Sequence, residues 1–341
     1  RVYSGFGMLD QTVTEDLRVS GGLRAEYSSI FTDVKEFDDL GYAADDLRRK
    51  TPEQSFILTP TKLKRWDLLP SVNIIYQLRK DDIAPSNLRL NYSRTIARPS
   101  IREYTEVVVR DFELNADVFG NADLKFVDIS NYDVRYENYF KTGSYASVSL
   151  FYKDFKNHIE LTSSNIGYTW SSADKSNVYG VELEGRVKIG AHVEFSSNIS
   201  LVKSYTRVEE RRLIIEDGVK SWEVYGIAER TMFGQAPFVV NAILSYTATK
   251  GFSASLSYNV QGPKLVLTSV DSSPDVYELP KHLLNFKVAH PLGKHFNVSL
   301  AIRDLLNDPL TRSYKYDEGF LLDFDQYRYG TDFVLGVAYT L

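Results

Sequence analysis

The chain has 341 residues, of which 43% are hydrophobic and 25% are charged, and its formal net charge is -5. This balance excludes a disordered chain and a protein that coats nucleic acid. Because cysteine is absent, disulfides, cysteine-bound zinc and thiol nucleophiles are excluded as well. No run approaches the roughly 18 uninterrupted apolar residues of a membrane-spanning helix.

Alternation of apolar and polar residues dominates the chain. From Phe252 to Gln261, for example, apolar residues at even positions alternate with Ser, Asn and Gln at odd positions, which is typical of a strand. In chain order, such runs predict roughly thirteen strands. They lie near residues 2–13, 16–29, 66–79, 87–97, 130–141, 144–156, 177–190, 192–206, 236–247, 252–264, 281–291, 295–306 and 327–341.

The length of these runs favours a membrane barrel over a soluble sandwich. Strands of a soluble sandwich seldom exceed about six residues, whereas about ten alternating residues, when tilted, span the apolar band of a bilayer. The predicted fold is therefore all-β, a transmembrane antiparallel barrel with lipid outside and water or a plug inside.

The connections between the predicted strands differ in length in a regular way. Tight turns are expected near 14–15, 141–144, 190–191, 247–251 and 291–294, and the connection 79–86 is intermediate. Long loops are expected near 30–65, 98–129, 157–176, 207–235, 265–280 and 307–326. In outer-membrane barrels the short turns face the periplasm, so the long loops are predicted to be extracellular.

The strand count predicts an incomplete barrel. About thirteen strands leave about nine missing from a barrel of about 22, and residues 1–341 are expected to form the carboxy-terminal part of one barrel domain. Unpaired edge strands in hydrocarbon cost several kcal/mol per unsatisfied group. We therefore expect the missing strands to come from upstream sequence or from a separate polypeptide. The chain starts at Arg1 rather than Met, which suggests processing or a fragment.

Several ordered motifs resemble one family. The segment 91–100 (NYSRTIARPS), followed by 120–125 (GNADLK) and 131–137 (NYDVRYE), resembles consecutive segments of TonB-dependent receptor barrels, particularly those of the Bacteroidetes type. The segments 22–27 (GLRAEY), 179–184 (YGVELE), 234–237 (GQAP) and 302–307 (IRDLLN) are similar to further family motifs. The chain departs from the family at Ala122 and Phe126, where prolines are usual, and at its end, where Tyr339 stands near a final Leu341.

The resemblance implies an active-uptake receptor. In this family an amino-terminal plug fills the barrel, and a short segment before the plug binds TonB, which passes energy from the inner membrane. Neither part is recognised in these residues. The implied import ligand is a siderophore, cobalamin, glycan or peptide. The implied partners are outer-membrane lipid and lipopolysaccharide, the upstream strands and plug, and TonB, with a surface lipoprotein as a further candidate; no nucleic acid or cofactor is implied.

Charged residues on the polar face of the strands are predicted to face the lumen. They suit a wall that hydrogen-bonds a plug, although solvation of the lumen alone would also explain them. These candidates are Arg18, Arg24, Glu26, Arg89, Asp133, Arg135, Glu137, Glu182, Glu184, Arg186, Lys287, Arg303 and Asp332.

Aromatic and charged residues of the long loops are the candidates for ligand contact, since loops carry function on a rigid scaffold. They are Tyr104, Arg110, Asp111, Tyr168, Trp170, Arg211, Arg212, Trp222 and Tyr225. For Trp170 and Trp222, packing of the loop on itself is the alternative. Tyrosines near strand ends are instead expected to form an aromatic girdle at the lipid interface. These are Tyr27, Tyr76, Tyr92, Tyr136, Tyr152, Tyr205 and Tyr258.

Metal binding and catalysis find little support. The acidic run 38–46 (DDLGYAADD) lacks the spacing of an EF-hand loop and is expected to be a solvated loop. The five histidines are dispersed, and His158 near Asp154 and Glu160 has no positioned nucleophile. A passive porin and a scaffold subunit of an outer-membrane complex remain the alternatives to a receptor.

Overall fold

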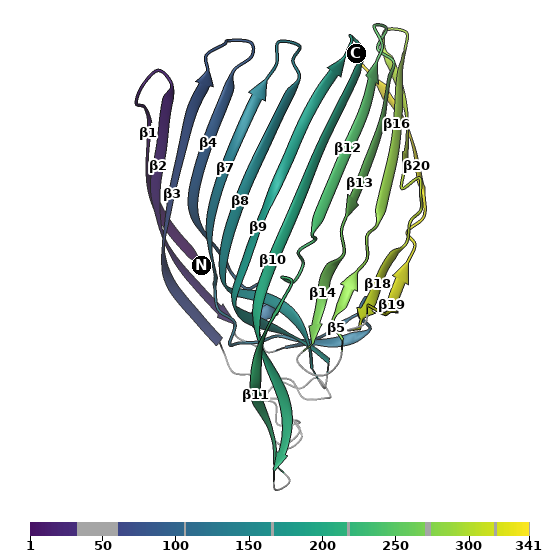
Figure 1. The fold of residues 1–341 in the computed structure, drawn as a ribbon. Coiled ribbons are helices and arrows are strands. Elements are labelled where there is room, and N and C mark those ends of the chain that lie inside the picture. Colours follow the sequence, from purple (N-terminus) through teal and green to yellow (C-terminus); the bar gives the residue numbers. More distant parts are fainter. Residues whose placement is uncertain are drawn as a thin grey trace, which may run out of the picture.

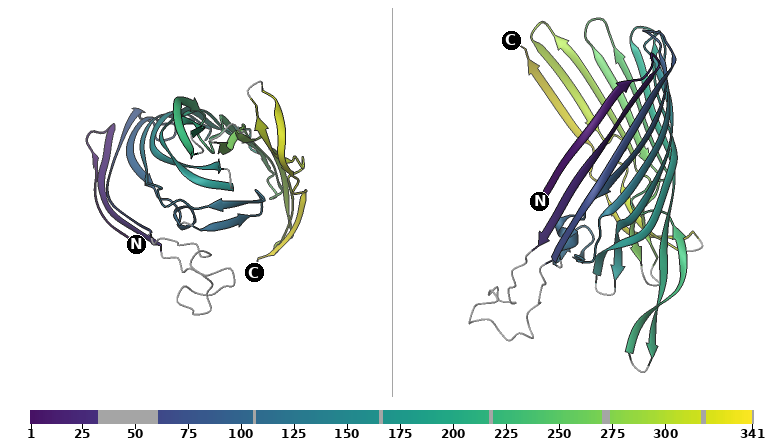
Figure 2. Two further views of the ribbon diagram at one scale, coloured as in Figure 1. Left: turned by 90° about the horizontal axis from the view of Figure 1, so that it is seen from below. Right: turned by 90° about the vertical axis from the view of Figure 1, so that its left-hand side faces the viewer.

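The computed structural model describes residues 1–32, 61–105, 107–164, 167–216, 219–269, 274–316 and 319–340. Long, tilted strands stand side by side and curve into an arc (Figure 1). Seen along the strands, β1 and β20 lie on the two sides of this arc (Figure 2). Within the described ranges, no helix is long and apolar enough to cross a membrane.

Thirteen strands form the wall in the described residues, and each pairs antiparallel with the next. This confirms the expected all-β antiparallel architecture. The wall strands are β1 (Val2–Thr12), β2 (Leu17–Thr32), β3 (Thr61–Arg79), β4 (Ser86–Ala97), β7 (Val127–Tyr139), β8 (Tyr145–Ser164), β9 (Gly167–Ile189), β10 (Val193–Glu216), β12 (Phe238–Thr247), β13 (Ser253–Gln261), β16 (His282–Leu292), β17 (Phe296–Arg303) and β20 (Asp332–Tyr339).

The two edges of the wall are open in the described part of the chain. There β1 pairs with β2 alone, and β20 pairs with β17 alone. Each edge therefore presents a row of backbone donors and acceptors that further strands would satisfy.

Short turns gather at one end of the wall, the upper end in Figure 1. Four of these turns contain a glycine with positive φ: Gly143 (77°), Gly190 (65°), Gly251 (84°) and Gly293 (68°). A side chain at such a φ would be strained, so these glycines allow the chain to reverse within a few residues. We call the opposite end the long-connection end.

The outer face of the wall is apolar and exposed. One row of directly paired residues runs across six strands through Phe195, Leu244, Leu256, Phe286, Ile302 and Phe333. Leu335, on the same face of β20, is 72% exposed. A sheet that exposes a continuous apolar face and turns a polar face inward matches a membrane barrel.

Tyrosines border this apolar face. The rings of Tyr92 and Tyr132 lie 5.1 Å apart, those of Tyr132 and Tyr152 6.0 Å, and those of Tyr179 and Tyr205 6.2 Å. Of the other expected girdle residues, Tyr27 packs on Trp66, Tyr258 hydrogen-bonds His282, and Tyr76 and Tyr136 are exposed.

The long connections differ from the irregular loops expected from sequence. Much of 157–176 and 207–235 is strand, because β8, β9 and β10 extend beyond their expected ends and β11 (Val219–Arg230) pairs with β10. Other connections contain α1 (Ile101–Tyr104), β5 (Val108–Asp111), β6 (Ala116–Phe119), β14 (Lys264–Ser269), β15 (Val276–Glu278), β18 (Leu310–Lys315) and β19 (Leu321–Tyr327). Strands this short carry too few residues for alternation to be visible.

These short elements gather at the long-connection end, where Figure 1 shows β5, β14, β18 and β19 together. We use the name cap for residues 101–126, 158–173, 264–278 and 310–327 within the described ranges. Pairings between distant segments hold the cap: β6 pairs with β9, β14 with β8, and β15 with β18.

Candidate functional site

The strand register places all thirteen charged lumen candidates on the inner face of the wall. In the strand register Arg89 lies opposite Arg135, Ser149 opposite Glu182, and Arg303 opposite Asp332. Together with the intervening strand pairings, these continue one face from β2 to β20. Because side chains alternate along a strand, a continuous register also fixes the direction of the other members of each strand.

Ion pairs near the long-connection end of β2, β3 and β4 connect several of these residues. Glu26, only 4% exposed, accepts from Arg24 at 2.8 Å and also pairs with Arg98. The Nε of Arg98 donates to Ser28 Oγ at 3.0 Å. On the neighbouring strand, Arg65 pairs with Asp67 at 2.6 Å and with Asp128. Each of these carboxylates is thus compensated by at least one arginine, and for Glu26 and Asp128 an arginine comes from another part of the wall.

A second group is centred on Arg135. Its guanidinium pairs with Glu137 at 2.9 Å and Glu184 at 2.8 Å, and Arg89 pairs with the other oxygen of Glu137 at 2.9 Å. Tyr145 donates its hydroxyl to Glu184 at 2.8 Å. This group crosslinks β4, β7, β8 and β9, so it holds a fixed polar surface on the inner wall.

A hollow of about 670 Å³ lies beside this group on the inner wall. Its lining mixes the rings of Phe151, Phe155 and Phe233 with charged residues, among them Asp133, Lys153 and Glu182. Phe151 fits against the wall because residue 180 is glycine, since a Cβ there would lie 2.7 Å from the ring. The hollow could receive a group with both apolar and polar parts.

Along β8, the residues that face inward change from odd to even numbers at Asn157. Before it, Phe151 and Phe155 line the hollow, whereas after it the even-numbered Glu160 and Thr162 are buried. Asn157 has φ of +57°, which turns the strand by one side-chain position, and Asn tolerates this conformation. The turn brings the tip of β8 into the cap.

A small hydrophobic core holds the cap together. Val118, Leu161, Leu267 and Val276 form it, each from a different element. Tyr168 and Trp170 pack against this core, and the backbone carbonyl of Trp170 accepts a 2.8 Å hydrogen bond from Asn121 Nδ2. The cap is therefore a folded unit with its own interior.

Buried ionisable groups lie beside this core, in the cap and outside the part of the wall whose apolar outer face the tyrosines border. Glu160, 4% exposed, pairs with Arg230. Burial raises the pKa of Glu160, against the opposing effect of Arg230. Burial and the nearby Arg230 lower the pKa of His158 to about 4, and burial raises the pKa of Asp275. From the sequence, His158 was considered only beside Asp154 and Glu160, without a positioned nucleophile. The pairing of Glu160 with Arg230 was not expected, because the two residues are 70 positions apart.

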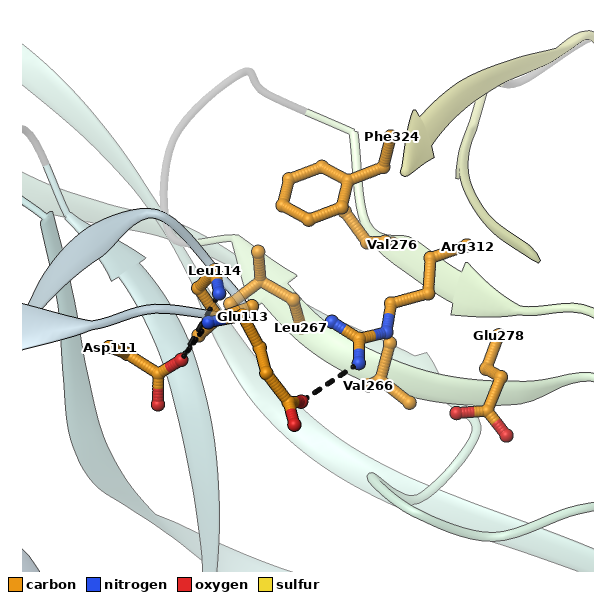
Figure 3. Close-up of a pocket in the computed structure, with 9 residues that line it drawn as sticks. All are labelled: Asp111, Glu113, Leu114, Val266, Leu267, Val276, Glu278, Arg312 and Phe324. Carbon is orange, nitrogen blue, oxygen red and sulfur yellow. Dashed lines mark hydrogen bonds and ion pairs between the residues drawn. The ribbon is translucent and has the colours of Figure 1, made fainter. Parts of the chain in front are cut away.

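A pocket of about 190 Å³ lies in the cap (Figure 3). Its apolar wall consists of Leu114, Val266, Leu267, Val276 and Phe324, and its charged residues are Asp111, Glu113, Glu278 and Arg312. Arg312 pairs with Glu113 at 3.3 Å and with Asp325 at 3.2 Å. The hydroxyl of Tyr327 donates to the Glu113 carbonyl at 3.1 Å. These contacts join the β5–β6 hairpin to β18–β19.

The ligand-contact candidates fall into three groups. Tyr104 is buried, and Tyr168 and Trp170 pack on the cap core, so these three serve the packing of the cap. Arg110 is exposed and bonds to Asp117 and Asn115, while Asp111 lines the pocket. Arg211 and Arg212 lie in β10 and Trp222 and Tyr225 in β11, but their side chains are outside the described residues. The acidic run 38–46 is also outside them.

Comparisons with known proteins agree with this architecture. Residues 1–305 match a family model described as "TonB dependent receptor-like, beta-barrel". No curated protein sequence matches the chain.

Three solved structures illustrate the likeness of fold. A structure titled "Copper transporter OprC" is 14% identical with a TM-score of 0.63, over 99% of this chain and 47% of its own. The ferric-catecholate import receptor Fiu from E. coli K12 is 12% identical with a TM-score of 0.64, over 99% of this chain and 44% of its own. The ferric yersiniabactin uptake receptor FyuA from Yersinia pestis is 12% identical with a TM-score of 0.62, over 100% of this chain and 46% of its own. The chain thus spans about half the length of these proteins.

Proposed function

The chain belongs to the family of TonB dependent receptor-like β-barrels, and on this premise we propose that it forms the carboxy-terminal part of the barrel of an active import receptor. The family and the solved neighbours place such barrels in the outer membrane of Gram-negative bacteria, and the exposed apolar outer face agrees with this location. The whole receptor would import a scarce or bulky ligand with energy passed from the inner membrane by TonB.

The observation that carries this proposal is the inner face of the wall. It holds ion pairs that are fixed across several strands, and beside them Asp133, Lys153 and Glu182 line a hollow that mixes aromatic and charged side chains. Such a surface supports hydrogen bonding to a folded plug that moves during transport while the wall stays rigid. In this proposal the missing strands and the plug are supplied by upstream sequence or by a separate polypeptide.

The cap supports a direction for transport. We propose that the long-connection end is extracellular and that the ligand arrives there. In this proposal Arg110, Asp111 and the β10–β11 hairpin with Arg211, Arg212, Trp222 and Tyr225 contact the ligand. Tyr104, Tyr168 and Trp170 hold the cap in shape.

The candidate ligands are siderophores, cobalamin, glycans and peptides. Because the neighbours include a copper transporter and receptors for ferric chelates, metal chelates are the first class to test. Assignment to the Bacteroidetes type stays a prediction from the sequence motifs. The proposal is transport rather than catalysis, as for the other receptors and transporters of the family.

The deciding experiment measures uptake of labelled ligands of each class in cells with and without this gene, and with and without the energising protein. We expect uptake of one class to need both. Uptake that needs this gene but not the energising protein would indicate a passive pore. Unchanged uptake of every class would favour a scaffold subunit, and copurifying partner proteins would then identify its complex.

A further inference from the structure

The short-turn end of the wall is divided into two sectors of different charge. The first, which we call the paired rim, consists of Glu15, Asp16, Lys80, Asp81 and Lys141. Lys80 pairs with Asp16 at 2.8 Å and with Glu15 at 3.0 Å, and Lys141 pairs with Asp81 at 3.8 Å. The lysines of this sector are therefore neutralised by carboxylates of the same rim.

The second sector, which we call the basic rim, consists of His192, Lys250, His290, Lys294 and His295, all exposed. The turns 190–192, 248–252 and 293–295 contain no Asp or Glu. Within the described ranges, neither Lys250 nor Lys294 has an ion pair. In Figure 1 the two rims occupy different parts of the upper edge, the paired rim at β1 to β8 and the basic rim from the β9–β10 turn to the β16–β17 turn.

Aromatic rings lie directly below the basic rim and alternate with its histidines. His192 is 6.0 Å from Tyr246, Tyr246 is 6.2 Å from Phe252, and Phe252 is 6.0 Å from His290. The ring of Phe296, at the start of β17, lies 5.0 Å from that of Tyr339 on the outer face. Such a belt marks the level where lipid tails meet headgroups, so the lysines just beyond it are at headgroup depth.

Two histidines of this rim are held in one orientation by the same contact. His192 Nδ1 donates to the Thr247 carbonyl at 2.8 Å, and His295 Nδ1 donates to the Thr340 carbonyl at 3.0 Å. Because a carbonyl can only accept, Nδ1 carries the proton in both rings. Nε2 is then left for a group outside the wall.

We propose that the basic rim binds the headgroup of an anionic phospholipid. Lys250 and Lys294 bind the phosphate, the histidines bind headgroup hydroxyls, and the aromatic rings contact the first carbons of the lipid chains. The proposal rests on the outer-membrane location and is independent of which ligand the receptor imports. It also predicts that more lipid is held at this side of the barrel, because Lys80 and Lys141 of the paired rim are paired with carboxylates.

The test measures binding of phosphatidylglycerol and phosphatidylcholine to the purified full-length protein by native mass spectrometry. A lysine near an anionic surface contributes about 1 kcal/mol. Replacing both lysines in K250Q/K294Q should therefore weaken phosphatidylglycerol binding about 30-fold, the equivalent of about 2 kcal/mol. The charge-conserving K250R/K294R should restore binding. Phosphatidylcholine, whose phosphate is neutralised by its own ammonium group, should lose much less than phosphatidylglycerol in K250Q/K294Q.

The matched control is K141Q, an exposed lysine of a short turn in the paired rim. It should leave phosphatidylglycerol binding unchanged, and added inorganic phosphate should not compete with the lipid. Equal loss in K141Q and K250Q/K294Q, or no loss in the latter, would overturn the proposal. Competition by inorganic phosphate would show a phosphate site instead of a lipid site. Uptake assays separate this result from the proposed transport, which can fail while lipid binding persists.

Discussion

Removing Arg230 should selectively destabilise the cap while the wall stays intact. The side chains of Arg230 and Glu160 are only 16% and 6% exposed, so Arg230→Met leaves a carboxylate buried without its cation. Breaking a buried ion pair in this way costs about 3 to 5 kcal/mol. If the cap opens locally, this cost corresponds to about two to four decades in hydrogen-exchange protection.

The assay is hydrogen exchange of the full-length protein, with backbone amides of the wall as an internal reference. We expect faster exchange in 158–173 and 264–269, and unchanged exchange in β12 and β13. The control Arg110→Met removes an exposed pair, whose side chains are 49% and 46% exposed and which contributes about 0 to 1 kcal/mol. The double variant Glu160→Gln with Arg230→Met should recover most of the loss, because residue 160 then carries no buried charge. Equal exchange in Arg230→Met and Arg110→Met would refute the reasoning.

Three further predictions test the cap, the wall and its outer face. The pKa of His158 is lowered to about 4 from its usual 6.5, so the folded cap favours the neutral imidazole. Hydrogen-exchange protection of the cap should therefore be complete above pH 6.5 and decline toward pH 4. In His158→Gln this decline should become smaller, and an unchanged pH profile would contradict the assignment. Gly180→Ala should lower barrel stability by about 1 to 3 kcal/mol, because its Cβ would lie 2.4 Å from the Leu201 carbonyl oxygen. The control Gly185→Ala should be tolerated, because its Cβ meets nothing closer than 3.7 Å. Thermal unfolding measures the stability of both variants, and equal stability would argue against this packing. Leu256→Arg on the outer face should cost about 2 to 4 kcal/mol in lipid, while Ser257→Arg on the inner face should be tolerated; equal folding yields in lipid vesicles would argue against a lipid-facing Leu256.

The ligand candidates show where sequence reasoning reached its limit. Aromatic residues in a long connection suggest either ligand contact or internal packing, and the sequence alone did not decide between them for Trp170. In the structure, Trp170 packs against a core to which Val118, Leu267 and Val276 contribute from distant segments. The buried pair of Glu160 and Arg230 was missed for the same reason, since its members are close only after β8 and β11 have folded.

The sequence by itself determined the wall. Neighbouring side chains of a strand point to opposite faces, so strand positions, the apolar outer face and the polar inner face are local properties that alternation records. The turn glycines and the contrast of short and long connections were equally local. Only the tertiary structure decided the cap, because its strands are short and their partners lie far away in the chain. The left-handed Asn157, which turns the tip of β8 inward, likewise acquires its meaning only through the core that it completes.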